Sequence, residues 1–282
     1  MAASAGVARR TAKASGSVIG TSQVRLLQGC SVMQVYVDPA PGGEATNLAL
    51  GHLLARRAEH EESFEALHVY QPSGRSVVFG RRETRSPGFP AAVRAARDVG
   101  FEPLIRATGG RAVAYTERTV VMHHVRHEKE PIGGHDGRFV EIGERLVGVM
   151  RTLGVAARLG AVPGEYCPGA HSVNARGEAK LIGTAQRVLR QAWLFASLVV
   201  VGDEAVLRPV LTEVYGHLGQ PFDPASVGSL SAENPGLEPE VVARALLTEF
   251  AGTWPTQPVS ALGELLVEAD QLAVDHRVVV DP

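Results

Sequence analysis

The sequence predicts an α+β fold with a mixed or largely antiparallel sheet flanked by helices. Expected strands and helices follow each other irregularly, without the strict strand–helix alternation of a parallel α/β sheet. With 282 residues and 45% hydrophobic content, the chain suffices for one large core, or a core with a small appended domain. No apolar run reaches the roughly 18 residues that span a bilayer, so no membrane segment is expected.

The first half of the chain alternates short β-rich runs with two helical patterns. Apolar residues at helical spacing and the stop residue Gly100 indicate the helices. Pro, Ser and Gly at 72–74 form a turn, so the strands around it are expected to be neighbours. Strands are expected at 32–37, 67–70, 76–80, 103–105, 112–115 and 119–125, and helices at 44–58 and 90–99.

The second half is expected to open with a polar loop at 133–138 and a helix at 139–153 whose apolar residues share one side. Residues 174–177, Asn-Ala-Arg-Gly, predict a hairpin turn. Further strands are expected at 172–174, 179–185 and 193–201, and helices near 209–218, 238–251 and 259–272.

Charge is unevenly distributed over three expected parts: a flexible tail at 1–30, a main domain at 31–201 and an acidic helical extension at 202–282. The last part holds 13 acidic residues against three arginines and no lysine, a charge of −10, so residues 1–201 carry +8 of the net −2. The basic part is expected to attract an acidic macromolecule, more weakly as salt rises. Ordinary surface composition is the alternative.

The N-terminal residues combine basic side chains with Ala, Ser and Gly, and the first acidic residue is Asp38. This composition resembles a transit peptide, although a disordered tail is favoured because Gly and Ser interrupt any amphipathic helix. Two cysteines are few for a secreted protein stabilised by disulfides. A cytoplasmic protein with free thiols is expected, with an organellar transit peptide left open. Cys30 is interpreted as structural.

The first segment with chemical potential is Arg106-Ala-Thr-Gly-Gly-Arg-Ala-Val-Ala114. Two glycines after a strand let the backbone approach a ligand, and their amides can face a carbonyl or phosphate. A simple hairpin turn is the alternative.

The second segment is Gly164-Glu-Tyr-Cys-Pro-Gly-Ala-His-Ser172, which holds Cys167 on a loop constrained by Pro and Gly. Thiolates attack thioesters and other activated acyl groups readily. A small buried apolar side chain is the alternative role for such a cysteine.

The third segment is Gly177-Glu-Ala-Lys-Leu-Ile-Gly-Thr-Ala-Gln186, with Lys180 on an apolar strand. Its ammonium could face an acyl carbonyl oxygen or the phosphate of an acyl-adenylate. A solvated lysine on an edge strand is the alternative.

His123, His124 and His127 suggest a metal site only superficially. On a strand, His123 and His127 share a face but stand too far apart for one ion, and no further ligand completes a site. No metal is therefore expected. Nucleic-acid binding is not expected either, because basic and aromatic residues do not interleave.

Together the three segments resemble the superfamily of lipoate–protein ligase A, octanoyltransferases and biotin–protein ligases. Residues 106–113 are similar to its Arg-x-Ser/Thr-Gly-Gly-x-Ala-Val signature, 77–81 to its hydrophobic-Gly-Arg strand and 180–186 to its Lys-x-x-Gly-Ser/Thr-Ala-Gln segment. The resemblance runs in order from about 32 to 201. It implies a class II synthetase and biotin ligase-like catalytic domain at 31–201, followed by the helical extension.

Tyr166-Cys-Pro-Gly resembles the branch that moves octanoyl groups between lipoyl domains through a cysteine thioester. The resemblance implies that Cys167 is the nucleophile and that Lys180 orients the acyl carbonyl. His171 is a candidate base for Cys167, with exposure to solvent as the alternative. The acyl-binding residues it implies are Arg106, Thr108, Gly109, Gly110, Arg111, Ala112, Val113, Gly183, Thr184 and Ala185.

Two departures from the family pattern bear on substrate choice. The family often has His where Tyr115 stands, and relatives with Tyr-Cys-Pro-Gly have an aromatic residue and Asp in place of His171 and Ser172.

The expected activity is transfer of octanoyl or lipoyl groups to lysines of lipoyl-carrier domains through a Cys167 thioester, without a cofactor. The expected partners are the glycine cleavage H protein, the E2 subunit of 2-oxoacid dehydrogenases and acyl carrier protein. An ATP- and Mg-dependent lipoate–protein ligase acting through lipoyl-AMP is the first alternative. A non-catalytic acyl-binding module is the second.

Overall fold

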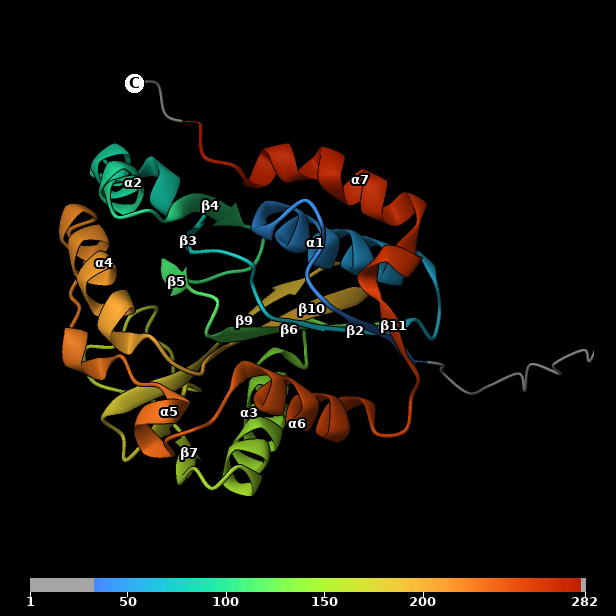
Figure 1. Cartoon of the computed structure of the whole chain (residues 1–282). Coiled ribbons are helices and arrows are strands. Elements are labelled where there is room, and N and C mark those ends of the chain that lie inside the picture. Colours follow the sequence, from blue (N-terminus) through green and yellow to red (C-terminus); the bar gives the residue numbers. More distant parts are fainter. Residues whose placement is uncertain (1–32, 280–282) are drawn as a thin grey trace, which may run out of the picture. The chain divides into compact units, whose positions relative to one another are not determined.

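The computed structural model describes residues 33–279, so the expected tail at 1–30, Cys30 and the expected strand start at residue 32 lie outside it. An eight-stranded sheet with helices on both faces adjoins a three-stranded sheet (Figure 1). Within the described residues, no helix is long and apolar enough to cross a membrane.

The large sheet has the strand order β11-β1-β2-β6-β10-β9-β8-β7. Its β11–β1 and β1–β2 pairs are parallel and the remaining pairs are antiparallel, so the predicted mixed sheet is confirmed. The strands are β1 (Met33–Val37), β2 (Glu65–Tyr70), β6 (Thr119–His127), β7 (Ala157–Leu159), β8 (Val173–Ala175), β9 (Ala179–Val188), β10 (Ala192–Val200) and β11 (Thr256–Pro258).

In the small sheet the central strand β3 (Ser76–Gly80) pairs with β4 (Glu102–Arg106) in parallel and with β5 (Val113–Tyr115) in antiparallel orientation. The Gly-Gly loop therefore runs from one edge strand to the other, not across a hairpin.

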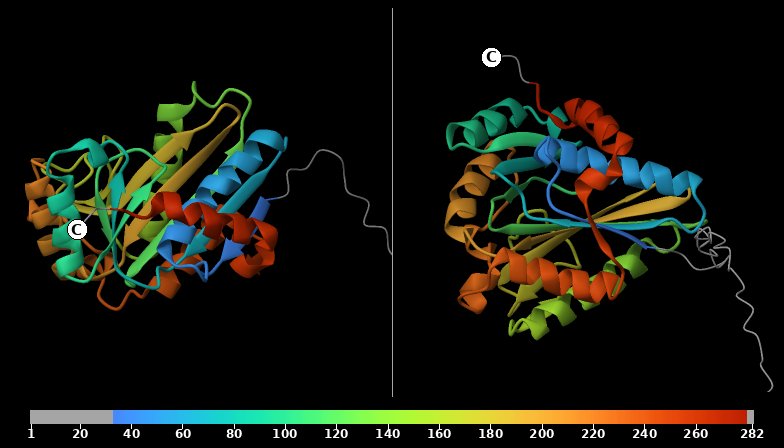
Figure 2. Two further views of the ribbon diagram at one scale, coloured as in Figure 1. Left: turned by 90° about the horizontal axis from the view of Figure 1, so that it is seen from above. Right: turned by 45° about the vertical axis from the view of Figure 1, so that its right-hand side comes forward.

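Helix α1 covers one face of the large sheet and α7 packs against α1, while α3 and α6 cover the other face (Figure 2). Helices α2 and α4 pack together beside the small sheet. The helices are α1 (Glu44–His60), α2 (Phe89–Asp98), α3 (His135–Thr152), α4 (Glu204–His217), α5 (Leu230–Glu233), α6 (Pro239–Ala251) and α7 (Glu264–Leu272), with 3-10 turns at Glu83–Arg85, Pro224–Ser226, Val259–Leu262 and Ala273–His276.

The apolar core divides into two layers because β-strand side chains alternate between faces. Leu194 and Leu198 of β10 belong to the layer beneath α1, whereas Phe195 and Val199 belong to the layer beneath α3 and α6. The layer beneath α1 continues into the small sheet, and a mainly apolar pocket described below lies within it.

One strand pairing predicted from the sequence is wrong. Residues 67–70 and 76–80, expected as neighbours around the turn at 72–74, lie in different sheets as β2 and β3. A short turn signal reports only that the chain changes direction. Strand β2, buried along almost its whole length, instead takes β1 and β6 as partners.

Two element boundaries also differ from expectation. The polar loop expected at 133–138 ends at the start of α3, since His135 already belongs to the helix, and α4 begins at Glu204, upstream of Pro209. The hairpin turn at 174–177 is confirmed between β8 and β9. Residues beyond 201 supply β11 to the large sheet and α4 to the site, while the domain boundary at 201 stays a prediction.

Buried histidines make stability depend on pH. Burial lowers the pKa of His68 to about 4 and that of His123 to about 3. In the unfolded chain both titrate near pH 6.5. Below that pH the unfolded chain binds protons that the folded chain does not, so stability falls with falling pH.

We therefore expect His123→Leu to gain stability relative to the wild type as pH falls from 6.5 to 4, by about 3 kcal/mol. Urea unfolding of both proteins at pH 6.5 and pH 4 measures this change. The contributions of the other titrating groups are the same in both proteins and cancel in the comparison. A difference between the two proteins that does not change with pH would contradict the assignment.

Candidate active site

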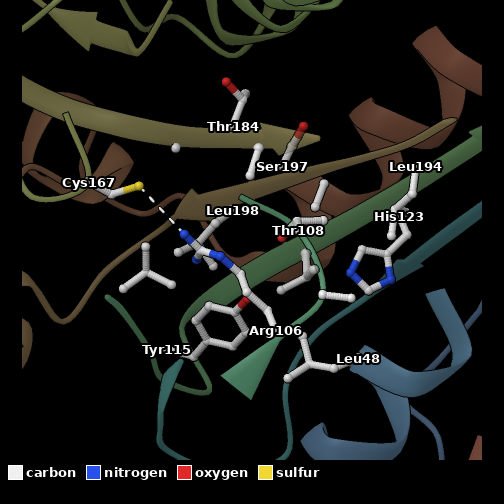
Figure 3. A pocket seen from close by; sticks show the side chains of 16 residues that line it. Leu48, Arg106, Thr108, Tyr115, His123, Cys167, Thr184, Leu194, Ser197 and Leu198 are labelled. Carbon is white, nitrogen blue, oxygen red and sulfur yellow. Dashed lines mark hydrogen bonds between the residues drawn. The ribbon is translucent and has the colours of Figure 1, made fainter. Parts of the chain in front are cut away.

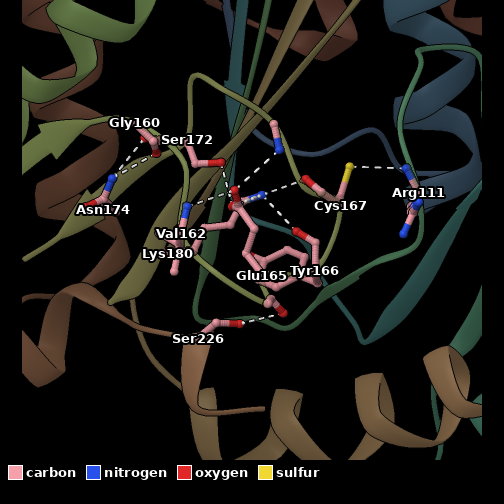
Figure 4. A network of polar contacts seen from close by, with 12 residues as sticks. Arg111, Gly160, Val162, Glu165, Tyr166, Cys167, Ser172, Asn174, Lys180 and Ser226 are labelled. Atoms are coloured by element: carbon pink, nitrogen blue, oxygen red, sulfur yellow. Dashed lines mark hydrogen bonds and ion pairs between the residues drawn. The ribbon is translucent and has the colours of Figure 1, made fainter. Parts of the chain in front are cut away.

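Cys167 lies on the loop between β7 and β8, where the three chemical segments of the sequence meet. Its Sγ accepts hydrogen bonds from the backbone N–H of Arg111 at 3.2 Å and from Nη2 of Arg106 at 3.5 Å (Figures 3 and 4). Both donors stabilise negative charge that builds on the sulfur, and the Arg106 guanidinium adds a positive charge of its own.

The Gly-Gly loop can approach this sulfur only because Gly110 has no side chain. A Cβ at this position would lie 2.6 Å from Sγ of Cys167 and 2.5 Å from Nη2 of Arg106, and the residue has a φ of +99°. The guanidinium of Arg106 is itself held by the carbonyl oxygens of Gly109 and Arg111. The loop and the arginine thus form one preorganised donor set for the sulfur.

Tyr215 of α4 links the cysteine loop to the Gly-Gly loop. Its hydroxyl accepts a hydrogen bond from the backbone N–H of Cys167 at 2.6 Å and donates one to the carbonyl oxygen of Ala112 at 2.9 Å. Burial raises the pKa of Tyr215, which keeps the phenol neutral and able to play both roles. Ala112 is held from its other side by Glu83, whose carboxylate accepts from its N–H.

Lys180 and Glu165 form a buried ion pair beneath the cysteine loop (Figure 4). Nζ of Lys180 lies 2.9 Å from Oε2 of Glu165 and donates to the carbonyl oxygens of Tyr166 and Cys167 at 2.9 and 3.0 Å. The side chains of Lys180 and Glu165 are 2% and 0% exposed. All three ammonium protons therefore have acceptors within the protein.

The Glu165 carboxylate also holds other parts of the cysteine loop through hydrogen bonds. It accepts hydrogen bonds from the backbone N–H groups of Val162 and Gly169 and, at 2.6 Å, from the Ser172 hydroxyl. Cys167 itself has a φ of +42°, a conformation that a residue with a Cβ adopts only when its surroundings impose it. The ion pair and its hydrogen bonds supply that constraint.

Two hollows meet at Cys167. The inner one is a mainly apolar pocket between α1, the large sheet and the small sheet (Figure 3). The outer one is more open, and both are lined by Cys167, Thr184 and Ala185. The thiol at this junction therefore adjoins an apolar pocket on one side and a more open hollow on the other. The outer hollow is further lined by Gly109, Gly110, His135, Phe139, His171, Lys180 and Gln186.

The candidate acyl-binding residues of the sequence analysis lie close to this junction. Arg106, Thr108, Val113 and Gly183 line the inner pocket. Arg111 and Ala112 act through their backbone groups, as described above.

His171 stacks on Phe139 with 5.6 Å between ring centroids, and no hydrogen bond joins it to Cys167 in the described part of the chain. Its role as a base stays a prediction.

Sequence reasoning missed Glu165, Tyr215 and Glu83. Glu165 stands two residues before Cys167, but nothing in the sequence separates a buried carboxylate from a surface one. Tyr215 reaches the loop from 48 residues away, a contact that no local pattern reports.

His124 and His127 of β6 each have a partner within the protein. His124 is hydrogen-bonded to Glu65, with 2.7 Å between Nε2 and Oε1, and Nδ1 of His127 lies 2.8 Å from the carbonyl oxygen of Ala58. Over residues 33–279, no group of three or more His, Cys, Asp or Glu is arranged to hold a metal.

Comparisons with known proteins show what this chain is similar to in sequence and in fold. The chain is similar to the octanoyl-[GcvH]:protein N-octanoyltransferase of Geobacillus kaustophilus, with 22% identity over 145 residues, which cover 51% of each chain. The chain thus spans about half the length of this curated relative.

Two solved structures share the fold. One is a lipoate protein ligase from Thermoplasma acidophilum with bound lipoic acid, with a TM-score of 0.66 and 20% identity over 86% of this chain and 95% of that one. The other, a bipartite lipoate protein ligase of that organism described together with its E2 lipoyl domain, gives a TM-score of 0.63 and 19% identity over 87% and 92%. The model of the lipoyl protein ligase A/B catalytic domain matches residues 44–251, and the chain belongs to this family.

Proposed function

We propose that the protein is a cysteine-dependent acyltransferase that moves octanoyl or lipoyl groups onto lysines of lipoyl-carrier domains. The observation that carries the proposal is the position of Cys167, whose sulfur accepts two N–H donors at the junction of an apolar pocket and an open hollow. A thiol that serves only as core packing would not be placed in this way.

The chemistry divides into two steps of acyl transfer. In the first, the Cys167 thiolate attacks the acyl carbonyl of the donor, an S–C bond forms, and the donor's thiol or amine leaves with a proton. In the second, the amine of the acceptor lysine attacks the thioester, an amide forms, the amine's proton is lost and the thiolate is restored. The acyl chain stays in the inner pocket while donor and acceptor exchange in the outer hollow.

The relatives suggest the partners. The Geobacillus protein is named for transfer from an octanoyl-carrying GcvH, and the Thermoplasma ligase is described with an E2 lipoyl domain. We propose lipoyl-carrier domains of these two kinds, the glycine cleavage H protein and E2, as partners of this chain, with acyl carrier protein as a further donor. The +8 charge of residues 1–201 suits an acidic carrier.

An ATP- and Mg-dependent lipoate–protein ligase is the second candidate, favoured by the fold shared with the Thermoplasma ligases. In such an enzyme Lys180 and the Gly-Gly loop would hold lipoyl-AMP. Against it, the three protons of Lys180 are already taken by Glu165 and two carbonyl oxygens, which leaves none for a phosphate. A non-catalytic acyl-binding module would have no use for an oriented thiol.

Incubation of the protein with octanoyl-H protein, free octanoic acid and an apo lipoyl domain, with and without ATP and Mg, tests the proposal. Transfer without ATP is the expected result. Transfer only in the presence of ATP would establish the ligase instead, and acyl binding without transfer under either condition would establish the binding module.

A further inference from the structure

The inner pocket is not a plain hydrocarbon tunnel. Most of its wall is aliphatic, contributed by Leu48, Val113, Val121, Leu194 and Leu198. Polar side chains also line it, among them Arg106, Thr108 and Ser197. His123 of β6 lies on the far side of the pocket from Cys167 (Figure 3).

His123 is buried without a hydrogen bond that would compensate for its loss of water. It is only 4% exposed, and neither ring nitrogen has a hydrogen-bond partner among residues 33–279. Nδ1 is fully buried against Gly51 of α1, so Nε2 is the nitrogen that a ligand in the pocket can meet. Burial lowers the pKa of His123 to about 3, so the imidazole is neutral and offers one N–H donor and one acceptor. An unpaired polar group in an apolar wall costs stability unless something pairs with it.

The surrounding structure makes room for this imidazole. A Cβ at Gly51 of α1 would lie 2.8 Å from Nδ1 of His123, so the helix passes the ring only because a glycine stands there. The ring packs edge-on against Tyr70, with 5.7 Å between centroids. Tyr70 in turn donates to the fully buried Glu44, whose pKa burial raises to about 8. A polar layer without formal charge at neutral pH thus lies behind the pocket wall.

We propose that the inner pocket takes acyl chains that carry a hydrogen-bonding heteroatom, hydroxyl oxygen or sulfur, along the chain, and that His123 is the residue that recognises it. The inference rests on the proposed function only in that the pocket holds an acyl chain. A saturated hydrocarbon would leave the imidazole unpaired, whereas a chain with a heteroatom would satisfy it. A site built to pair with a polar group discriminates against the analogue that lacks it far better than an apolar pocket does.

The test measures binding of free acids to the full chain by calorimetry, so it does not depend on transfer. Octanoic acid, 8-hydroxyoctanoic acid and lipoic acid are compared on the wild type, His123→Leu and His123→Gln. We expect at least one of the two polar acids to bind the wild type roughly tenfold more tightly than octanoic acid. Preference for the hydroxy acid identifies oxygen as the partner, and preference for lipoic acid identifies sulfur.

In His123→Leu the preference should fall to about one, because octanoic acid gains affinity and the polar acid loses it. His123→Gln, which keeps a donor and an acceptor, should retain most of the preference. His124→Leu is the matched control, because it removes an imidazole from the adjacent position on the opposite face of β6 and should keep the wild-type ratio. Equal binding of all three acids to the wild type, or an unchanged ratio in His123→Leu, overturns the proposal. Loss of acyl transfer with this preference intact would count against the proposed function alone.

Discussion

Replacement of Cys167 by Ser is expected to slow octanoyl transfer by roughly 10³-fold or more, because a serine hydroxyl at this position has no base within the donor set to activate it. The hydrogen-bond donors on Sγ, the N–H of Arg111 and the guanidinium of Arg106, stabilise an anion and accept no proton. They suit a thiolate and leave an alcohol inert.

The same experiment follows the intermediate directly. Mass spectrometry of the wild type after incubation with octanoyl-H protein should show one added octanoyl group, mapped to Cys167. Two protein substrates cannot both place their reacting groups in one narrow pocket, so the enzyme must hold the acyl group between them. Cys167→Ser should show no such adduct, or an ester that does not turn over.

Cys30→Ser is the control, and it should behave as the wild type in both assays. If Cys167→Ser instead transfers at the full rate and requires ATP, the thioester mechanism is wrong and the ligase alternative replaces it. An acylated Cys167 whose formation is slower than turnover would also contradict the mechanism.

Much of this site follows from short segments of sequence. The Gly-Gly loop, the Cys167 loop and the Lys180 strand were identified from composition, spacing and family resemblance, and the structure places all three together. The helices at 44–58, 90–99 and 238–251 are confirmed within a few residues, since apolar spacing and glycine or proline punctuation are local signals.

What sequence reasoning missed depends on contacts between distant residues. The wall of the inner pocket combines Leu48 of α1, Val121 of β6 and Leu194 of β10, and each alone has the pattern of an ordinary core residue. Tyr215 was assigned only to a C-terminal helix, yet it orients the cysteine loop. The prediction that β2 and β3 are neighbours failed for the same reason. Each strand pairs with a distant one, because register across a sheet is set by burial on both faces.

Lys180 shows how burial changes an expectation. From the sequence, its substitution was expected to leave folding intact and to slow transfer by about 10²–10³-fold through loss of an oxyanion donor. The structure instead pairs its ammonium with Glu165 beneath the loop, both side chains being almost completely buried. Removing one member of such a pair leaves an uncompensated buried charge, which typically costs about 3–5 kcal/mol.

Lys180→Met is therefore expected to lower the free energy of unfolding by about 3–5 kcal/mol, measured in urea. Alkylation of Cys167 by iodoacetamide should also slow, because a loop without its anchor no longer holds Sγ against the hydrogen-bond donors of Arg106 and Arg111. Glu165→Gln should have a smaller effect, because the amide still meets Ser172 and Lys180 keeps two carbonyl acceptors. The double variant Glu165→Gln/Lys180→Met removes both charges, so it should regain at least half of the stability that Lys180→Met loses. Recovery of alkylation and transfer together with stability would show that Lys180 acts by positioning the loop. A double variant that regains stability and alkylation while transfer stays as slow as in Lys180→Met would show that the ammonium acts on the acyl group itself.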